Sequence, residues 1–190
     1  MGDIDFSALA EHGKQYAGFS AADEAVLQAE GAKLIPYLAS VTDGFYQDLQ
    51  GIPQAQRFLE GRLESLKRTH QAWLEKIFTG PYDAEFAQVM HHVGEVHVRV
   101  QLPVEFMSSG IVLINNHLCP VLAEIYADDA AMMGRMVRAV NAVTGYSLIL
   151  MQESYQTSLL AEELERFLAI TGMSRKLFDN LANAYRDSDN

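Results

Sequence analysis

Cysteine and basic residues are scarce in this sequence, and both shortages exclude whole classes of protein. The single cysteine, Cys119, cannot form an intramolecular disulfide framework, and it fits a reducing compartment. The 14 Lys and Arg residues are outnumbered by 25 Asp and Glu residues, which gives a net charge of −11. Nucleic acids and anionic membranes attract basic surfaces, so this charge argues against both as partners.

Signals for membrane insertion, export and catalysis are missing as well. We find no apolar run close to the roughly 18 residues that cross a bilayer, and no signal peptide. The sequence has no Gly-rich phosphate loop, no Cys-x-x-Cys pair and no paired carboxylates on a pocket-facing stripe. We therefore expect a soluble, cytoplasmic protein that is not an enzyme.

The hydrophobic patterns that are present predict an all-α chain. Ser20 and Asp23 form a near capping box at the start of the first main helix. Helices are expected at Ala21 to about Lys33, Pro36 to Leu49, Pro53 to Leu59, Arg62 to Phe78, Phe86 to Val100, Pro103 to Tyr126 and, as a very long last helix, from about Asp129 past Leu164. The polar end, Asp187 to Asn190, is expected to fray. We expect a leader segment at 1–19, a domain at 20–157 and a helical extension at 158–190.

The stretch Phe86 to Val100 carries the most informative pattern. At about 100° per residue, one helical stripe takes up most of its apolar residues, which are Phe86, Val89, Met90, Val93, Val96 and Val100. His97 falls inside this stripe. His91 is expected on the opposite, solvent side beside Glu95 and Arg99, and His92 at the edge of the stripe.

Two interpretations of His97 follow from the helix alone. A histidine on an apolar face needs a partner, because a buried imidazole without one costs free energy. That partner is either a backbone carbonyl, as for an ordinary core histidine, or the iron of a flat, apolar haem. A zinc site is disfavoured, because His91 and His92 lie six and five residues from His97 and chelation on a helix needs spacings of three or four.

Three sequence motifs occur one after another along the chain, and together they point to a specific protein family. The segment GFYQDL is followed by HQAWLEKIFTGPYDAEF and then by VGEVHVRVQLPVEF, which contains Gly94, His97, Leu102 and Pro103 in a Gly-x-x-His-x-x-x-x-Leu-Pro pattern. Over roughly Ala21 to Gln156 the sequence resembles the sensor globins of the globin-coupled sensor family, which are related to protoglobins. The resemblance implies a globin fold of the sensor type with a long C-terminal helix.

The resemblance also implies a set of cofactor contacts. His97 matches the proximal ligand of haem b, and Tyr46 matches the distal tyrosine that donates a hydrogen bond to dioxygen on the iron. Leu66 and Thr69 match pocket positions, with Thr69 either supporting the gas or bonding back to its own helix. The remaining expected haem contacts are Phe45, Trp73, Val93, Val96 and Val100. Phe106 stands where relatives can carry a second tyrosine, and His70 is a less favoured candidate for a sixth iron ligand.

The function implied is a haem-based sensor of dioxygen and other diatomic gases, carbon monoxide and nitric oxide. Its last two main helices would pair between the subunits of a homodimer and pass the ligation state to an output domain, which this chain does not carry. One alternative is a haem-free, globin-like regulatory module whose pocket is filled by side chains. Another is an enzyme with peroxidase-like activity or dioxygenase activity on nitric oxide, although no electron-donor domain is encoded here.

Overall fold

The computed structural model describes residues 4–188, with side chains described through residue 182. Within these residues the regular elements are helices and no strand is present, as the all-α prediction requires. The chain divides into two compact units, Met1–Ser154 and Tyr155–Asn190. Whether a functional domain follows the expected boundaries of 20–157 stays a prediction.

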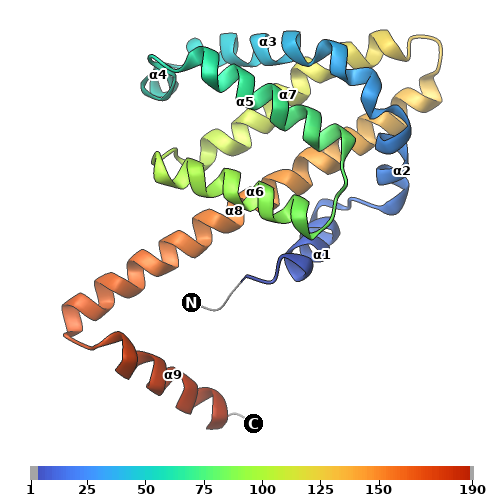
Figure 1. Ribbon diagram of the computed structural model, residues 1–190. Coiled ribbons are helices and arrows are strands. Elements are labelled where there is room, and N and C mark those ends of the chain that lie inside the picture. Colours follow the sequence, from blue (N-terminus) through green and yellow to red (C-terminus); the bar gives the residue numbers. More distant parts are fainter. Residues whose placement is uncertain (1–3, 189–190) are drawn as a thin grey trace. The chain divides into compact units, whose positions relative to one another are not determined.

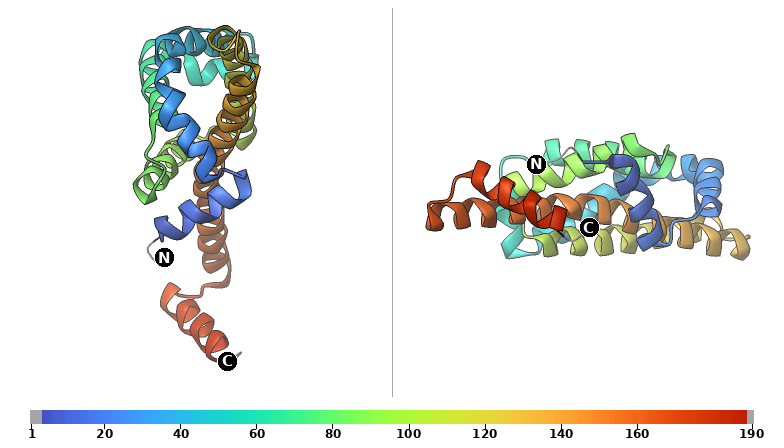
Figure 2. Two further views of the ribbon diagram at one scale, coloured as in Figure 1. Left: turned by 90° about the vertical axis from the view of Figure 1, so that its right-hand side faces the viewer. Right: turned by 90° about the horizontal axis from the view of Figure 1, so that it is seen from below.

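The first unit is built from helices in two layers. Figures 1 and 2 show α5 and α6 in one layer and α7 with the first part of α8 in the other. The elements in chain order are α1 (Phe6–Ala17), α2 (Ala21–Glu30), the 3-10 helix η1 (Gly31–Tyr37), α3 (Leu38–Gln50), the 3-10 helix η2 (Pro53–Ala55), α4 (Gln56–Leu59), α5 (Leu63–Thr79), α6 (Ala84–Arg99), α7 (Val104–Ile125) and α8 (Ala130–Thr171).

Helix α2 ends earlier than its sequence pattern predicts. The expected end was near Lys33, but the chain becomes a 3-10 helix at Gly31 and stays one through Tyr37. A side chain at position 31 would collide with the backbone carbonyl of Phe78, so the chain approaches the end of α5 closely here. Pro36 lacks the N–H that a continuing α-helix would use.

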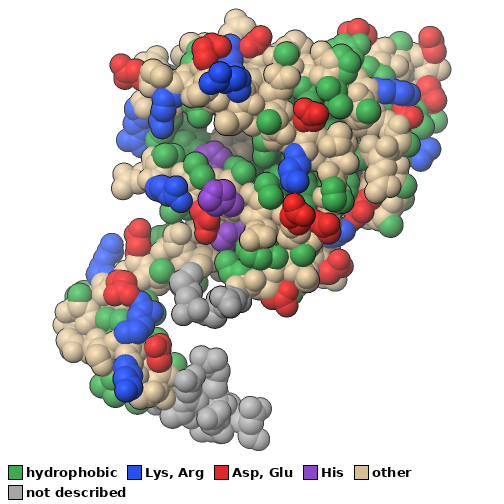
Figure 3. Space-filling view, in the orientation of Figure 1, with side chains coloured by type: hydrophobic (Ala, Val, Ile, Leu, Met, Phe, Trp, Pro, Cys, Tyr) green, Lys and Arg blue, Asp and Glu red, His purple; other side chains and the backbone are tan. Residues whose placement is uncertain are grey.

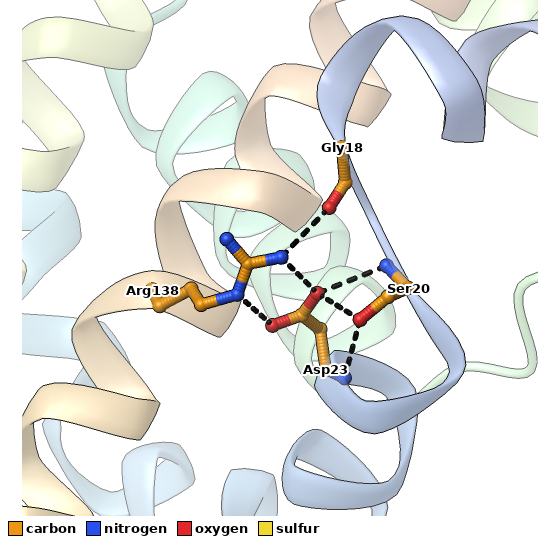
Figure 4. Close-up of polar contacts among 4 residues, drawn as sticks. All are labelled: Gly18, Ser20, Asp23 and Arg138. Carbon is orange, nitrogen blue, oxygen red and sulfur yellow. Dashed lines mark hydrogen bonds and ion pairs between the residues drawn. The ribbon is translucent and has the colours of Figure 1, made fainter.

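A polar cluster fixes the start of α2 to α8 (Figure 4). The predicted capping box is present, because the Asp23 N–H donates to Ser20 Oγ and the Ser20 N–H donates to Asp23 Oδ2 at 2.9 Å. Arg138 on α8 binds the same carboxylate, with 3.0 Å between Nε and Oδ1, and donates to the carbonyl of Gly18. Burial alone would raise the pKa of Asp23, but the Ser20 hydrogen bonds and the Arg138 charge outweigh it and lower that pKa.

Helix α1 covers a side of α6 that the sequence pattern assigns to solvent. His91 was expected to be exposed, and this prediction is wrong: its exposed fraction is 4%. The Phe6 ring of α1 contacts the His91 ring edge-on, with 5.6 Å between the ring centroids. A pattern read from one helix cannot show that a neighbouring helix packs on its polar side. His92, expected at the edge of the stripe, is exposed over 64% of its side chain.

Helices α6 and α8 cross with their backbones in contact at Gly94. A Cβ atom at position 94 would collide with the Met151 carbonyl and lie 2.6 Å from Ser154 Oγ. Ser154 Oγ also donates a buried hydrogen bond of 2.7 Å to the carbonyl oxygen of His91. Glycine is required at this crossing because no other residue lets the two helices approach so closely.

Helix α7 is long and apolar enough to cross a membrane by length and composition, contrary to the expectation that no such run exists. It packs against α3 and contributes buried side chains to the core, among them Ile114, Leu118 and Leu122. A core helix passes the same composition test, so the signal is weak.

The predicted long last helix is confirmed and is followed by one more. Helix α8 has 42 residues, and α9 (Arg175–Ser188) follows it. Asp187 and Ser188 were expected to fray but belong to α9, whereas residues 189–190 lie outside the described part of the chain. Within the second unit, the rings of Phe167 and Phe178 contact each other and Glu165 pairs with Arg175. Several large apolar side chains of this unit are exposed: Leu159, Leu160, Phe167, Ile170, Leu177 and Leu181.

The crossing predicts opposite effects for two glycine substitutions. Gly94→Ala should lower the free energy of unfolding by about 1–3 kcal/mol, because the added methyl group forces α6 and α8 apart. Gly134→Ala, in α8 with nothing within 4 Å of the added methyl group, should raise it by about 0.5–1 kcal/mol through helix propensity. Urea unfolding followed by circular dichroism measures both. Equal effects of the two substitutions would contradict the close crossing.

Candidate functional site

The first unit contains a cavity of about 440 Å³, within the range of ligand sites in proteins. Figure 3 shows a hollow in this face between α5 and α6, with histidine side chains beside it. The walls come from α3, α5, α6, α7 and α8, together with the short helices before α5. Most of the lining side chains are aliphatic or aromatic.

All nine residues expected to contact a cofactor lie on the wall of this cavity. They are Phe45, Tyr46, Leu66, Thr69, Trp73, Val93, Val96, His97 and Val100. Their roles toward a cofactor stay predictions. His70 and Phe106, which the sequence analysis considered for other roles at the pocket, also line the cavity. Sequence reasoning did not assign a further set of lining residues, which are Leu49, Ala55, Phe58, Leu59, Arg62, His92, Leu102, Met107, Gly110, Ile111, Ile114 and Met151.

His97 presents a neutral imidazole to the cavity. Burial lowers its pKa below the ordinary value of 6.5, so the ring is uncharged at neutral pH. Its Nδ1 atom is buried and has no hydrogen-bond partner among residues 4–188. The carbonyl acceptor that an ordinary core histidine would use is therefore absent at Nδ1 in the described structure. A neutral imidazole is the form that coordinates a metal.

The apolar stripe of α6 changes its environment along the helix. Phe86 and Met90, in its first half, are buried in the core. Val96 and Val100, in its second half, are 41% and 37% exposed, and both line the cavity. These valines and His97 thus offer an apolar surface with one nitrogen ligand, which is the surface that a haem requires.

Tyr46 supplies a hydrogen-bond donor from α3. Its side chain is buried, and burial raises the pKa of its hydroxyl to about 12, so the phenol keeps its proton at neutral pH. The Tyr46 ring packs edge-on against the rings of Phe45 and His70, at centroid distances of 5.0 and 5.6 Å. These contacts hold the ring on the cavity wall.

Thr69 uses its hydroxyl within its own helix. Its Oγ1 donates toward the carbonyl oxygens of Ser65 and Leu66, at 3.2 and 3.0 Å. Of the two alternatives that the sequence left open, the structure therefore contains the bond back to the helix. The hydroxyl hydrogen of Thr69 is not available to a molecule in the cavity.

His70 is held more firmly than its sequence position indicated. Its ring stacks on Phe45 and on Trp73, with centroid distances of 4.6 and 5.5 Å, and its Nδ1 lies 3.2 Å from Thr42 Oγ1. Burial lowers its pKa to about 4, so the ring is neutral. Its Nε2 is buried without a partner in the described residues, which makes it a second polar atom beside Tyr46.

Trp73 connects the two helices that border the cavity. Its Nε1–H on α5 donates to the sulfur of Met90 on α6 at 3.2 Å. This bond satisfies the indole N–H while the ring contacts the cavity, as expected for a packing residue. The two walls are thereby fixed to each other at one end of the site.

The residues fit a haem better than a bare metal ion. No cluster of three or more His, Cys, Asp or Glu side chains with metal-binding geometry occurs in the described part of the chain. The cavity instead combines a large apolar surface with the neutral His97 from α6 and, among its other polar side chains, Tyr46 from α3 and His70 from α5. Haem needs this combination, because its ring is apolar and its iron takes an axial nitrogen.

Comparison with known proteins agrees with this geometry. The family model described as Protoglobin matches residues 7–161. The globin domain of a Geobacter sulfurreducens globin-coupled sensor is 25% identical with a TM-score of 0.70, and the likeness covers 76% of this chain and 96% of that one. The ferric globin domain of E. coli DosC is 20% identical with a TM-score of 0.65, covering 77% and 99% of the two chains. At 20% identity, the similarity to the DosC domain supports the fold only.

Curated relatives match over shorter stretches. Diguanylate cyclase DosC of Shigella boydii serotype 4 is 24% identical over 113 residues, which is 57% of this chain and 25% of the relative. Diguanylate cyclase DosC of Escherichia coli K12 is 29% identical over 82 residues, or 41% of this chain and 18% of the relative. The matched part is thus a quarter or less of each relative.

Proposed function

Because the chain belongs to the protoglobin family and is a globin domain of the globin-coupled sensor type, we propose that it binds haem b and senses dioxygen. Haem, when bound, supplies an iron atom with an open position for a diatomic gas. The observation that carries this proposal is the neutral His97 between half-exposed valines on the wall of an apolar cavity. Carbon monoxide and nitric oxide are expected to bind at the same position.

Each lining residue has a defined part in this proposal. His97 would hold the iron through Nε2, and Val93, Val96 and Val100 on α6 would give the haem apolar contacts. Phe45, Leu66 and Trp73 exclude water from the other walls, because they present apolar surface to the cavity. Tyr46 donates a hydrogen bond to the bound gas, since its hydroxyl is protonated and no described residue accepts from it.

The two alternative functions have less support. A haem-free regulatory module would fill the pocket with side chains, whereas a cavity of about 440 Å³ remains here. The alternative of a peroxidase-like activity or a dioxygenase activity on nitric oxide gains no support from the relatives, which are named diguanylate cyclases and are matched over a quarter or less of their length. We therefore assign the sensing step to this chain and leave catalysis to another domain.

The crossing of α6 and α8 offers a route for the signal. If ligand binding moved His97, α6 would be displaced, and α6 contacts α8 through Gly94 and the Ser154–His91 hydrogen bond. Because packed helices shift between discrete arrangements, two positions of α6 would favour two positions of α8. The long α8 would then carry the difference toward an output domain.

Replacing His97 tests the haem site directly. His97→Ala should reduce the haem content of the purified protein at least about tenfold, because the only axial nitrogen on α6 that faces the cavity interior is removed. His92→Ala should keep its haem. His91→Ala should lose stability, since it empties a buried site against α1, but its folded fraction should still bind haem. Absorbance and the pyridine haemochrome assay measure the content; retention by His97→Ala with loss by His92→Ala would refute the assignment.

Replacing Tyr46 tests the distal hydrogen bond. Tyr46→Phe should make dioxygen dissociate about ten- to a hundredfold faster, because a bond to a partly charged ligand contributes roughly 1.5–3 kcal/mol in a dry site. Carbon monoxide, which is a weaker acceptor, should be almost unaffected and is the control. Stopped-flow measures both rates. An unchanged dioxygen rate would transfer the donor role to His70, because the Thr69 hydroxyl hydrogen is already bonded.

We also propose that the chain forms a homodimer through α7 and α8. In the first unit, Val104 and Val112 on α7 are each more than 40% exposed, and in the second unit Leu159 and Leu160 on α8 are exposed as well. Large exposed apolar side chains need a partner, and a two-fold dimer provides one by pairing each helix with its copy in the other subunit. Sedimentation at micromolar concentration should give the mass of a dimer. A Val112→Lys variant should dissociate, and a monomeric wild-type protein would exclude the proposal.

A further inference from the structure

One rim of the cavity is made by residues of α4, residues that follow α6 and the start of α7. Phe58 and Leu59 belong to α4, Val100 and Leu102 follow α6, and Phe106 lies in the first turn of α7. The rings of Phe58 and Phe106 contact each other at 5.9 Å between centroids. Apart from Arg62, this rim is therefore apolar.

Arg62 is the exception on this apolar rim. It is the residue directly before α5, and its side chain is exposed. Among the side chains described, those of residues 4–182, it is the only Lys or Arg that lines the cavity. No Asp or Glu is among the described lining residues. A permanent positive charge thus stands at the border between an apolar cavity and water.

The guanidinium of Arg62 uses only some of its hydrogen-bond donors within the protein. One Nη atom donates to the carbonyl oxygen of Phe58 at 3.0 Å, which holds the side chain against the rim. No ion pair to Arg62 is found among the described residues, whereas Lys67, on the next turn of α5, pairs with Asp43. A guanidinium has five N–H groups in a planar fork, so the remaining donors suit a carboxylate.

We propose that Arg62 binds a propionate carboxylate of the haem at the rim of the cavity. This inference rests on the proposed function, because only a haem would bring such a group here. An apolar molecule with anionic ends is most stable when its ring lies among apolar side chains and its charge meets a cation near water. Arg62 provides that cation, and the contact fixes which edge of the haem faces out.

His92 is the other side chain on the cavity wall that can carry a positive charge and is exposed to solvent. Its Nδ1 lies 3.0 Å from Glu95 Oε2 on the same helix, so a carboxylate already lies against this side of the ring. That carboxylate would repel a second anion. The structure therefore assigns the propionate contact to Arg62 and not to His92.

The test compares two variants and two forms of the cofactor. Arg62→Met removes the charge but keeps a long apolar side chain. Arg68→Met is the matched control, because Arg68 is also exposed on α5 and does not line the cavity. Each protein is loaded with haem b or with its dimethyl ester, in which both carboxylates are neutral. Transfer to excess apomyoglobin measures the rate at which each form dissociates, and circular dichroism checks that each variant is folded.

Arg62→Met should release haem b about tenfold faster than the wild type, and raised salt should reduce this difference. It should leave the dissociation rate of the dimethyl ester unchanged, and Arg68→Met should change neither rate. An equal acceleration for both cofactor forms, or no acceleration for either, would overturn the role of Arg62. If the wild-type protein takes up neither form, the proposed function itself fails and this inference fails with it.

Discussion

The contact between α6 and α8 at Gly94 is the constraint on which the site depends. Because glycine lets the two backbones meet and Ser154 bonds to the His91 carbonyl, the rotation of α6 about its own axis is fixed. With that rotation fixed, His91 must face α1 and His97 must face the cavity. One helix thereby carries a structural histidine and a ligand-binding histidine on different sides.

The cavity follows from the same arrangement. Its inner part is closed by rings that hold one another, since His70 stacks between Phe45 and Trp73, and Trp73 bonds to Met90. Its outer part keeps half-exposed valines, because no side chain of the described structure covers them. The polar atoms in this apolar region are few, so each of them has a large effect on what can bind.

Sequence patterns predicted the fold and the helix that carries His97, and they failed where neighbouring helices decide the outcome. The fold was predictable because helical periodicity and the Gly94–His97–Leu102–Pro103 motif are local in the chain. The burial of His91 was not, since α1 lies about eighty residues away in sequence. Arg62 gave no signal for a similar reason: its place on the rim depends on α4, α6 and α7 meeting beside it.

The absorbance spectrum of the purified protein with haem tests the central claim most directly. Coordination by His97 in an apolar cavity predicts a strong Soret band, and in the ferrous protein this band should shift when dioxygen or carbon monoxide is added. A spectrum that equals that of free haem, or a band that neither gas shifts, would contradict the proposal that this globin domain senses diatomic gases.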